Sequence, residues 1–380
     1  MEKKKIIRLS TVPESLNVFC KDLLKDLSKD YEVIAVSSSG KEMEEISERE
    51  NVRTVSVNME RRISPFRDLK SLFGLIKVFR REKPDIVHSI TPKAGLLGML
   101  AARLTGVKVR IHTFTGLVFP SSTGLKRKLL KFTDALTCRC ATHIIPEGRG
   151  VMNDLINNHV TKKTLRILGH GNVRGVDMNY YCLSDDVEKR AAELKSSNSF
   201  TFVFVGRVVR DKGVEELVDA FVRLQGEMPF LRLFVVGGFD AGIDPISEQT
   251  KKLMESSDSI TLFGSQADVR PFYAASDCFV LASYREGFPN TPLEAGAMGL
   301  PCVVTDINGA NEIIVEGENG LIVPPKDKEA LYSAMKRIAE DKELYGKLKS
   351  NARKMIESRF ERGYVWGCLK DFYKEVLSDV

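Results

Sequence analysis

The chain has 380 residues, of which 43% are hydrophobic and 28% are charged. This length favours two domains of about 150–200 residues each, and the composition is that of a soluble globular protein. The longest apolar stretches are about half as long as a membrane-spanning helix requires. The seven cysteines are scattered and form no Cys-x-x-Cys pair, which argues against a disulfide framework or zinc site and fits a reducing cytoplasm.

The net charge of +6 conceals an asymmetry between the two halves of the chain. Residues 1–178 contain 32 Lys/Arg and 19 Asp/Glu, a balance of +13, whereas residues 179–380 contain 25 and 32, a balance of −7. A basic half and an acidic half should meet different partners. Nucleic acid, an anionic membrane and a phosphorylated lipid all fit the basic half, so charge alone leaves these partners open.

Short β-branched runs alternate with helical patterns from the N-terminus onward. The Lys-rich start resembles a secretion signal, but no long apolar stretch follows it, so we interpret it as a first strand. In the first half we predict strands at residues 5–9, 31–36, 86–90, 107–113 and 143–146, and helices that include 16–27 and 93–104.

The second half repeats this rhythm. We predict strands at residues 200–205, 231–236, 260–263, 278–281, 302–305 and 320–323, and helices at 215–224, 271–275, 292–298 and 328–341. Two such series predict an α/β protein with two doubly wound, Rossmann-like domains built on parallel sheets. We place the domains at 1–178 and 179–360, followed by a helical segment at 361–380.

The first motif is Gly-Arg-Val-Val-Arg-Asp-Lys-Gly at residues 206–213, between an apolar strand and a helix. Ligands of open α/β sheets bind at the carboxyl ends of strands. Gly206 lets the backbone approach a bound group, and Arg207 and Lys212 supply a fork and a point charge that suit a diphosphate. The alternative is an exposed basic loop with a helix-capping glycine.

The second motif is Glu-Gly-Phe-Pro-Asn-Thr-Pro-Leu-Glu-Ala at residues 286–295, again after an apolar strand. Pro292 suits the first turn of a helix and Thr291 suits its N-cap, so the helix N-terminus should face the same sheet edge and attract an anion. Glu286 in the loop and Glu294 on the first turn could accept hydrogen bonds from the hydroxyls of a sugar. The alternative for Glu294 is that it only complements the helix dipole.

In order and spacing, these two motifs resemble the donor site of retaining family 4 glycosyltransferases of GT-B fold. Segments 91–95 and 110–116, and the loop Thr11-Val12-Pro13-Glu14-Ser15-Leu16, resemble the capsule and O-antigen branch of that family. The resemblance covers nearly the whole chain. It implies a hexosyltransferase whose two Rossmann-like domains face each other across a cleft, with the C-terminal helix crossing back to the first domain.

The resemblance implies roles for the matching positions. Arg207 and Lys212 would hold the donor diphosphate, Glu294 the ribose hydroxyls and Glu286 the transferred sugar. His112 matches a histidine that many relatives place near the sugar C6 hydroxyl or the reaction centre, and a packed strand-end histidine is the alternative. The remaining donor-binding positions would be Gly206, Gly264, Ser265, Gly287, Phe288, Pro289, Asn290 and Thr291.

The resemblance also implies a nucleotide-sugar substrate, with UDP favoured over GDP and an N-acetylhexosamine or hexose transferred. Because no Asp-x-Asp pair and no metal-ligand spacing is visible, we expect no metal and no other cofactor. The acceptor, a lipid-linked glycan or oligosaccharide, should bind to the basic domain. The positions that we place in the acceptor region are Thr11, Pro13, Ser15, Lys93, Gly116 and Glu147.

Two basic segments of the first domain have apolar residues at helical spacing. Residues 61–83 contain eight Lys/Arg and two Asp/Glu, and residues 125–132 add four more cations. Such segments can lie on an anionic membrane, although the apolar face could equally be core. The resemblance, with its lipid-linked acceptor, gives membrane contact a purpose and implies a cytoplasmic bacterial protein, peripheral on the inner face of the membrane, that serves surface polysaccharide synthesis.

Other functions remain open at this point. A nucleotide-sugar epimerase or a sugar phosphorylase can share the GT-B fold, but no cofactor-lysine context for a phosphorylase is visible. A nucleic-acid-binding protein would need aromatic residues interleaved with the basic ones on a strand platform, which we do not find, so we expect no nucleic-acid partner. The intact set of two cations and two carboxylates argues against a catalytically dead scaffold.

Overall fold

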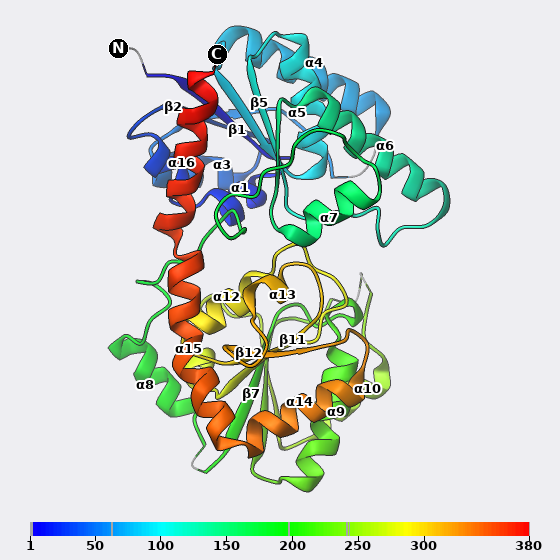
Figure 1. The fold of residues 1–380 in the computed structure, drawn as a ribbon, viewed down its shortest axis with the longest axis vertical. Coiled ribbons are helices and arrows are strands. Elements are labelled where there is room, and N and C mark those ends of the chain that lie inside the picture. The colour runs from blue at the N-terminus through cyan, green and yellow to red at the C-terminus, as the bar shows by residue number, and fades with distance from the viewer. Residues whose placement is uncertain (1–2, 62–63, 197, 241, 243, 380) are drawn as a thin grey trace. The chain divides into compact units, whose positions relative to one another are not determined.

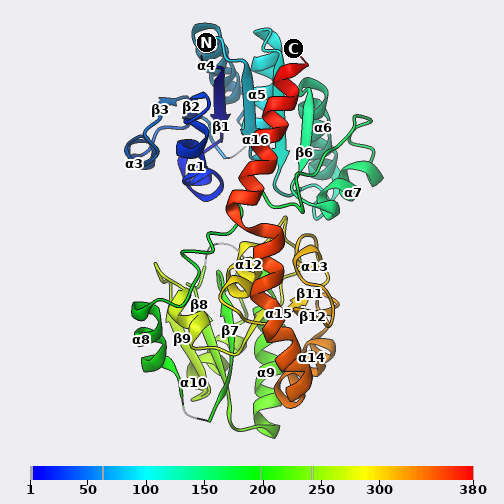
Figure 2. The same ribbon diagram turned by 60° about the vertical axis from the view of Figure 1, so that its left-hand side comes forward.

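The computed structural model describes residues 3–61, 64–196, 198–240, 242 and 244–379. Two compact units are present, one formed by Met1–Gly175 with Gly363–Val380 and the other by Val176–Arg362. The C-terminal helix, red in Figures 1 and 2, therefore belongs to the same unit as the N-terminal half. The predicted boundary after residue 178 lies within the first turns of the second unit.

The first unit contains a six-stranded parallel sheet in the order β3-β2-β1-β4-β5-β6. Its strands are β1 (Lys5–Leu9), β2 (Glu32–Ser37), β3 (Arg53–Ser56), β4 (Ile86–Ile90), β5 (Val109–Phe114) and β6 (His143–Pro146). Its helices are α1 (Pro13–Cys20), α2 (Leu23–Leu27), α3 (Lys41–Glu50), α4 (Pro65–Glu82), α5 (Pro92–Leu104), α6 (Gly124–Cys140), α7 (Arg149–Asn157) and α16 (Arg362–Ser378).

The second unit has a parallel sheet of the same size, in the order β12-β11-β10-β7-β8-β9. Its strands are β7 (Phe200–Val205), β8 (Leu231–Val236), β9 (Ile260–Gly264), β10 (Cys278–Leu281), β11 (Cys302–Thr305) and β12 (Gly320–Val323). Its helices are α8 (Asp185–Leu194), the 3-10 turn η1 (Arg210–Lys212), α9 (Val214–Glu227), α10 (Glu248–Ser256), α11 (Arg270–Ala274), α12 (Asn290–Ala297), α13 (Ala310–Ile313), α14 (Lys328–Glu340) and α15 (Lys342–Phe360).

Each sheet is covered by apolar side chains on both faces, which confirms the predicted pair of doubly wound domains. In parallel sheets of this kind the strands are buried on both sides and read as continuous apolar runs. The predicted helix at 16–27 is wrong in one respect, because the chain breaks it at Asp22. The buried Glu50 carboxylate accepts the N–H groups of Asp22 (2.9 Å) and Lys25 (3.1 Å), so α2 starts anew.

A buried polar cluster fastens α16 to the sheet of the first unit. Arg8 on β1 donates from Nη1 to the Tyr373 hydroxyl of α16 (2.8 Å), which also lies 2.6 Å from His88 Nδ1 on β4. Arg8 Nη1 is itself 2.5 Å from that Nδ1. Burial lowers the pKa of His88 well below its ordinary value, so the ring is neutral beside the guanidinium. The Tyr373 hydroxyl is thus the group that joins the helix to both strands.

Removing this hydroxyl tests the fastening. We expect Tyr373→Phe to lower the free energy of unfolding of the first unit by about 1–3 kcal/mol, since it leaves buried polar groups short of a partner. Chemical denaturation measures this change. Tyr31→Phe is the matched control, because Tyr31 packs edge-on against Tyr373 at a ring-centroid distance of 6.1 Å. Equal stability of Tyr373→Phe and the wild type would contradict the assignment.

A buried carboxyl group on α6 gives the first unit a pH dependence. Burial raises the pKa of Asp134 from 3.8 to about 7. Between these values the unfolded chain releases the proton while the folded protein keeps it, so the free energy of unfolding falls as pH rises. We expect Asp134→Asn to be more stable than the wild type by about 2–4 kcal/mol near pH 8, with no gain near pH 4. Thermal unfolding at both pH values measures this, and parallel pH profiles would contradict it.

Candidate functional site

In the second unit, three glycines lie at the carboxyl ends of neighbouring parallel strands. Gly206 follows β7 and donates to Val236 O (3.0 Å), while Gly237 follows β8 and donates to the carbonyl of Gly264, the last residue of β9 (2.8 Å). A Cβ on Gly237 would lie 1.8 Å from Gly206 O, so this approach admits only glycine. The predicted residues Gly206 and Gly264 therefore lie together. Gly237 escaped the sequence analysis, although two adjacent glycines after a strand are a visible signal.

Gly264 leads into Ser265, which lies near the same edge. A Cβ on Gly238 would approach Ser265 Oγ to 2.9 Å, so the loops after β8 and β9 touch. The carboxyl ends of β7, β8 and β9 thus form a floor of backbone with few side chains. Such a floor lets a flat or phosphorylated ligand approach the main chain.

The turn after β7 presents both predicted cations. Arg207 is largely exposed and its Nη1 lies 3.3 Å from Asp240 Oδ2, whereas Lys212 ends η1 and is mostly covered. The next residue, Gly213, has φ 66°, and a Cβ there would lie 1.9 Å from Ala282 O, just after β10. The turn and the β10 loop are therefore packed backbone against backbone.

A carboxylate that the sequence analysis did not single out holds this turn in place. Asp244 accepts the N–H of Asp211 on Oδ2 (2.8 Å) and the N–H of Arg210 on its main-chain carbonyl (2.9 Å). These are the first two N–H groups of η1, whose third residue is Lys212. Asp244 follows β8 in a loop, and no local pattern marks it as a partner of the β7 turn.

Lys212 reaches across to the second motif and forms an ion pair with Glu286 Oε1. The same oxygen accepts a hydrogen bond from Ser283 Oγ (3.1 Å). Both charged side chains are mostly covered, so solvent screens the pair less than a surface pair. The structure therefore joins the two sequence motifs through one contact between a cation and a carboxylate.

The helix after Glu286 begins earlier than predicted. α12 starts at Asn290, its N-cap is Pro289, and no side chain caps it. The prediction of Thr291 as N-cap is therefore wrong, because the extended Pro289 lets helical hydrogen bonding begin one residue later. Glu294 is the fifth helical residue instead of a first-turn residue, and it is buried.

Glu294 lies beside a buried tyrosine under the sheet edge. Burial, and after it the Glu294 carboxylate, raises the pKa of Tyr273 well above its ordinary value, so the phenol stays protonated. The loop 287–289 ahead of α12 is backed by Gly309, where a Cβ would lie 2.5 Å from Phe288 Cα. The predicted donor residues Gly287, Phe288 and Pro289 thus form a segment whose backbone packs closely against Gly309.

Two arginines of α15 hold the helices behind this segment. Arg353 donates to Ala297 O at the end of α12, and also to Met178 O (2.9 Å) and Tyr181 O (2.7 Å). Arg359 donates to Glu312 O (3.2 Å) and Ile313 O (2.7 Å) at the end of α13. Cations at helix C-termini satisfy the last carbonyls and complement the helix dipole.

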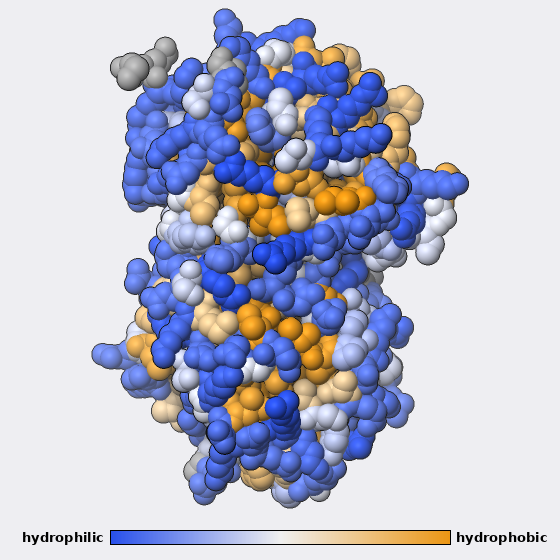
Figure 3. Space-filling model, viewed as in Figure 1, coloured by the Kyte–Doolittle hydropathy of each residue, from blue (hydrophilic) through white to orange (hydrophobic). Residues whose placement is uncertain are grey.

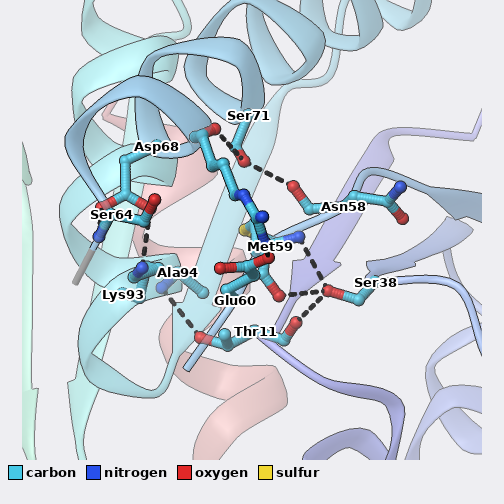
Figure 4. A network of polar contacts seen from close by, with 11 residues as sticks. Thr11, Ser38, Asn58, Met59, Glu60, Ser64, Asp68, Ser71, Lys93 and Ala94 are labelled. Atoms are coloured by element: carbon cyan, nitrogen blue, oxygen red, sulfur yellow. Dashed lines mark hydrogen bonds and ion pairs between the residues drawn. The ribbon is translucent and has the colours of Figure 1, made fainter. Parts of the chain in front are cut away.

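In the first unit, Thr11 lies in the loop after β1 within a polar network (Figure 4). Its Oγ1 lies 2.8 Å from Thr91 Oγ1 and accepts from Ala94 N (3.1 Å), and its carbonyl accepts from Ser38 Oγ (2.7 Å). Lys93 forms an ion pair with Asp68 of α4 (2.6 Å). The structure therefore brings the predicted Thr11 and Lys93 to one place, where the N-termini of α4 and α5 meet the first loop (Figure 4).

The remaining predicted positions of this unit also follow strand ends or start helices. Pro13 and Ser15 lie in the first turn of α1, and Gly116 (φ 138°) follows β5. Glu147 follows β6 and is buried, with its N–H donating to Phe114 O (2.9 Å) and its carbonyl accepting from Asn172 N (2.9 Å). These positions share the carboxyl edge of the sheet.

His112 is packed inside the first unit. Its Nδ1 lies 2.8 Å from Ser89 Oγ, and a Cβ on Gly95 of α5 would lie 2.3 Å from its ring. Burial lowers its pKa to about 3, so the imidazole is neutral at physiological pH. A neutral, oriented ring can donate or accept a hydrogen bond, but it cannot supply a positive charge.

Two family models match the chain, and together they span most of it. The model for glycosyl transferases group 1 matches residues 185–355, and the model for glycosyl transferase 4-like proteins matches residues 8–147. These matches fall on the second and first units respectively.

Named relatives extend the likeness to the full length. The capsular polysaccharide biosynthesis glycosyltransferase CapM of Staphylococcus aureus is 31% identical over 381 residues, covering 100% of this chain and 99% of the relative. The UDP-Gal:alpha-D-GlcNAc-diphosphoundecaprenol alpha-1,3-galactosyltransferase of Escherichia coli is 30% identical, covering 83% of this chain and 82% of the relative.

Solved structures share the architecture. Anabaena Alr3699/HepE in complex with UDP superposes with a TM-score of 0.82 at 19% identity, covering 98% of this chain and 100% of the other. At this identity the likeness shows the fold. Together with the full-length relative, it means that the chain belongs to the group 1 glycosyltransferases, in their capsular polysaccharide branch, and is a glycosyltransferase of GT-B fold.

Proposed function

We propose that the enzyme moves a hexose or N-acetylhexosamine, with retention of anomeric configuration, from a nucleoside diphosphate sugar to a lipid-linked glycan of bacterial surface polysaccharide. UDP is the favoured nucleotide and GDP the alternative. The observation that carries the proposal is the Lys212–Glu286 ion pair, which joins a phosphate-binding cation to a sugar-binding carboxylate at one sheet edge.

The diphosphate has two cations to bind it. Arg207 is paired with Asp240 and Lys212 with Glu286. A diphosphate carries more charge than one carboxylate, so it competes well for both side chains. The N-terminus of α12, whose N-cap Pro289 has no side-chain acceptor, adds a favourable dipole for the same anion. No metal is included in the proposal, because these groups supply the positive charge.

The two carboxylates bind the sugars. Once the diphosphate takes Lys212, the Glu286 carboxylate is free to accept hydrogen bonds from the hydroxyls of the transferred sugar. Glu294, held beside Tyr273, would accept hydrogen bonds from the ribose hydroxyls. Gly206, Gly264 and Ser265 form the backbone floor for the nucleoside. The remaining contacts to phosphate and sugar would come from Gly287, Phe288, Pro289, Asn290 and Thr291.

The chemical step breaks the bond between the anomeric carbon and the β-phosphate oxygen. The acceptor hydroxyl attacks from the side of the leaving group, its oxygen bonds to the anomeric carbon, and its proton passes to the departing phosphate. Negative charge grows on that phosphate, and Arg207 and Lys212 stabilise it. His112, being neutral, would orient a sugar hydroxyl and not transfer the proton.

The first unit is the proposed acceptor side. The printed name of the Escherichia coli relative describes a sugar acceptor on diphosphoundecaprenol, a lipid. An acceptor of that kind carries a diphosphate on a membrane anchor, which suits a basic domain with Thr11 in its first loop and Lys93 in the first turn of α5. Pro13, Ser15, Gly116 and Glu147 complete the proposed acceptor region.

Membrane contact is part of the same proposal. In the described part of the chain, the helices are all too short or too polar to cross a bilayer. We place the enzyme in the cytoplasm, peripheral on the inner face of the membrane, where a lipid-linked acceptor is reached without leaving the surface.

The cations can be tested by truncation. We expect Arg207→Ala and Lys212→Ala each to lower kcat by about 10–100-fold, because each removes a charge-assisted hydrogen bond worth about 1.5–3 kcal/mol in the transition state. Sugar transfer from the best donor, found by thermal shift with UDP-, GDP- and ADP-sugars, is the measurement. Arg223→Ala on α9 is the control, since Arg223 pairs with Glu329 at the surface. Undiminished sugar transfer by Arg207→Ala would contradict the assignment of Arg207 to the donor diphosphate.

If Lys212 exchanges Glu286 for the diphosphate, substitution of Glu286 should affect UDP affinity and sugar transfer in opposite directions. We expect Glu286→Gln to bind UDP about 3–10-fold more tightly, because the neutral amide no longer competes for Lys212, and to transfer sugar at least about tenfold more slowly. Calorimetry with UDP and a transfer assay measure the two effects. A parallel loss of UDP affinity and activity would contradict the exchange.

Retention itself has a direct test. From an α-linked donor we expect an α-linked product, and the anomeric coupling constant in the proton NMR spectrum of the product reports it. A β-linked product would refute the proposed attack from the leaving-group side while leaving the donor residues unaffected.

A further inference from the structure

A groove of about 540 Å³ lies between α4 and β3 in the first unit. β3 is the edge strand of its sheet, so the groove runs along a free edge. The side chains that α4 contributes are three or four residues apart and therefore share one face of the helix. The polar side chains of the lining are Ser56, Asn58, Glu60, Arg67, Lys70, Ser71, Lys77 and Arg81.

Two of these four cations are uncompensated. Arg67 forms an ion pair with Glu60, and Arg81 lies 2.7 Å from Glu82. Lys70 and Lys77 have neither an acidic nor a hydrogen-bonded partner among the residues that the structure describes, which omit Arg62 and Ile63 of the predicted basic segment. Two ammonium groups on one wall of a groove suit a phosphate oxygen acceptor.

Gly74 lies between the two lysines and lets α4 approach the chain after β3 closely. A Cβ at this position would lie 3.0 Å from Val57 Cγ1, so a larger side chain would crowd the helix against the chain beyond β3. The groove is therefore formed by the close approach of α4 to the sheet edge, with the lysines above and below the gap.

An exposed apolar stripe lies beside the lysines on the same helix. Phe66 is 90% exposed, Leu69 51% and Phe73 63%. At about 100° per residue these three fall in a sector of about 60°, and the sector of Lys70 and Lys77 adjoins it. Apolar side chains reach the surface among hydrophilic ones over this unit (Figure 3).

A second helix of the unit repeats this combination. On α6, Leu125, Leu129 and Phe132 are exposed, and the helix carries Lys126, Lys128 and Lys131. Both α4 and α6 pack against α5, so they flank one helix on one face of the sheet. An apolar stripe bordered by cations on neighbouring helices has the charge and hydrophobicity of a surface for anionic lipid.

We propose that the groove between β3 and α4 binds the phosphate of an anionic phospholipid, held by Lys70 and Lys77, while Phe66, Leu69 and Phe73 enter the acyl region. The long lysine stems let the charges stay at headgroup depth beside buried aromatic rings. The purpose of this contact rests on the proposed function, since a lipid-linked acceptor requires the enzyme at the membrane. The binding itself needs neither donor nor acceptor.

The network of Figure 4 connects this surface to the acceptor loop. Ser71 of α4 donates to Asn58 O at the groove, and Lys93 pairs with Asp68 one turn earlier on α4. Ser38 bonds both Thr11 O and Met59 O (2.7 Å each). A lipid headgroup in the groove would therefore sit beside the loop proposed to receive the lipid-linked acceptor.

Co-sedimentation with phosphatidylcholine vesicles, with and without phosphatidylglycerol, tests the groove. We expect binding only with phosphatidylglycerol, and a loss of at least about 25-fold in Lys70→Glu/Lys77→Glu, since removal of each positive charge alone costs about fivefold. Lys21→Glu/Lys162→Glu changes the net charge equally in two loops of the same unit, and we expect it to lose far less vesicle binding. Equal losses in the two double variants would overturn the groove in favour of diffuse charge.

Two further measurements test the exposed apolar side chains of α4 and distinguish a lipid headgroup from free phosphate. We expect Phe66→Ser/Phe73→Ser to reduce vesicle binding at least about tenfold, also at high salt, whereas Phe230→Ser in the second unit should not. Saturation of the groove by inorganic phosphate without vesicle binding would identify a free-anion site and refute the lipid assignment. UDP binding, measured in parallel, should be unchanged in every variant, so failure here is distinguishable from failure of the donor site.

Discussion

The ion pair between Lys212 and Glu286 is the contact that links the two sequence motifs of the second unit. It joins the loop after β7 to the loop after β10, two neighbouring strands of one sheet. Since the pair is mostly covered, losing either partner leaves the other charge uncompensated in a poorly solvated place. The ion pair therefore fixes the position of the Lys212 ammonium group relative to the loop after β10.

Backbone packing makes that contact possible. Gly213 lets the turn rest on the carbonyl of Ala282, and Gly237 lets the next loop rest on Gly206. Behind these loops, Arg353 and Arg359 of α15 hold the far ends of α12 and α13 through main-chain carbonyls. The carboxyl end of this sheet is thus assembled from loops, which are fixed by close glycine contacts or lie next to helices held by an arginine of α15.

Much of this could be predicted from the sequence, because the strongest signals are local. The buried strands read as β-branched runs, and the two motifs lie directly after two of them. β3 was missed because an edge strand is half exposed and reads as polar. The break at Asp22 depends on Glu50, and the hold on η1 depends on Asp244, so both arise from contacts between residues distant in sequence. The pairing of Arg207 with Asp240 was unpredictable for the same reason.

The C-terminal helix has a consequence for the order in which the two units complete folding during synthesis. Leu369, Phe372, Tyr373 and Val376 lie in the same core as Ile6 and Ile86. On the ribosome, the strands of the first unit emerge early but lack part of their apolar cover, and the Tyr373 hydroxyl that bonds Arg8, until α16 has been synthesised. The second unit, contiguous from Val176 to Arg362, can complete its core first. The domain synthesised first is therefore the one that finishes folding last, which reverses the usual N-terminal-first order of multidomain proteins.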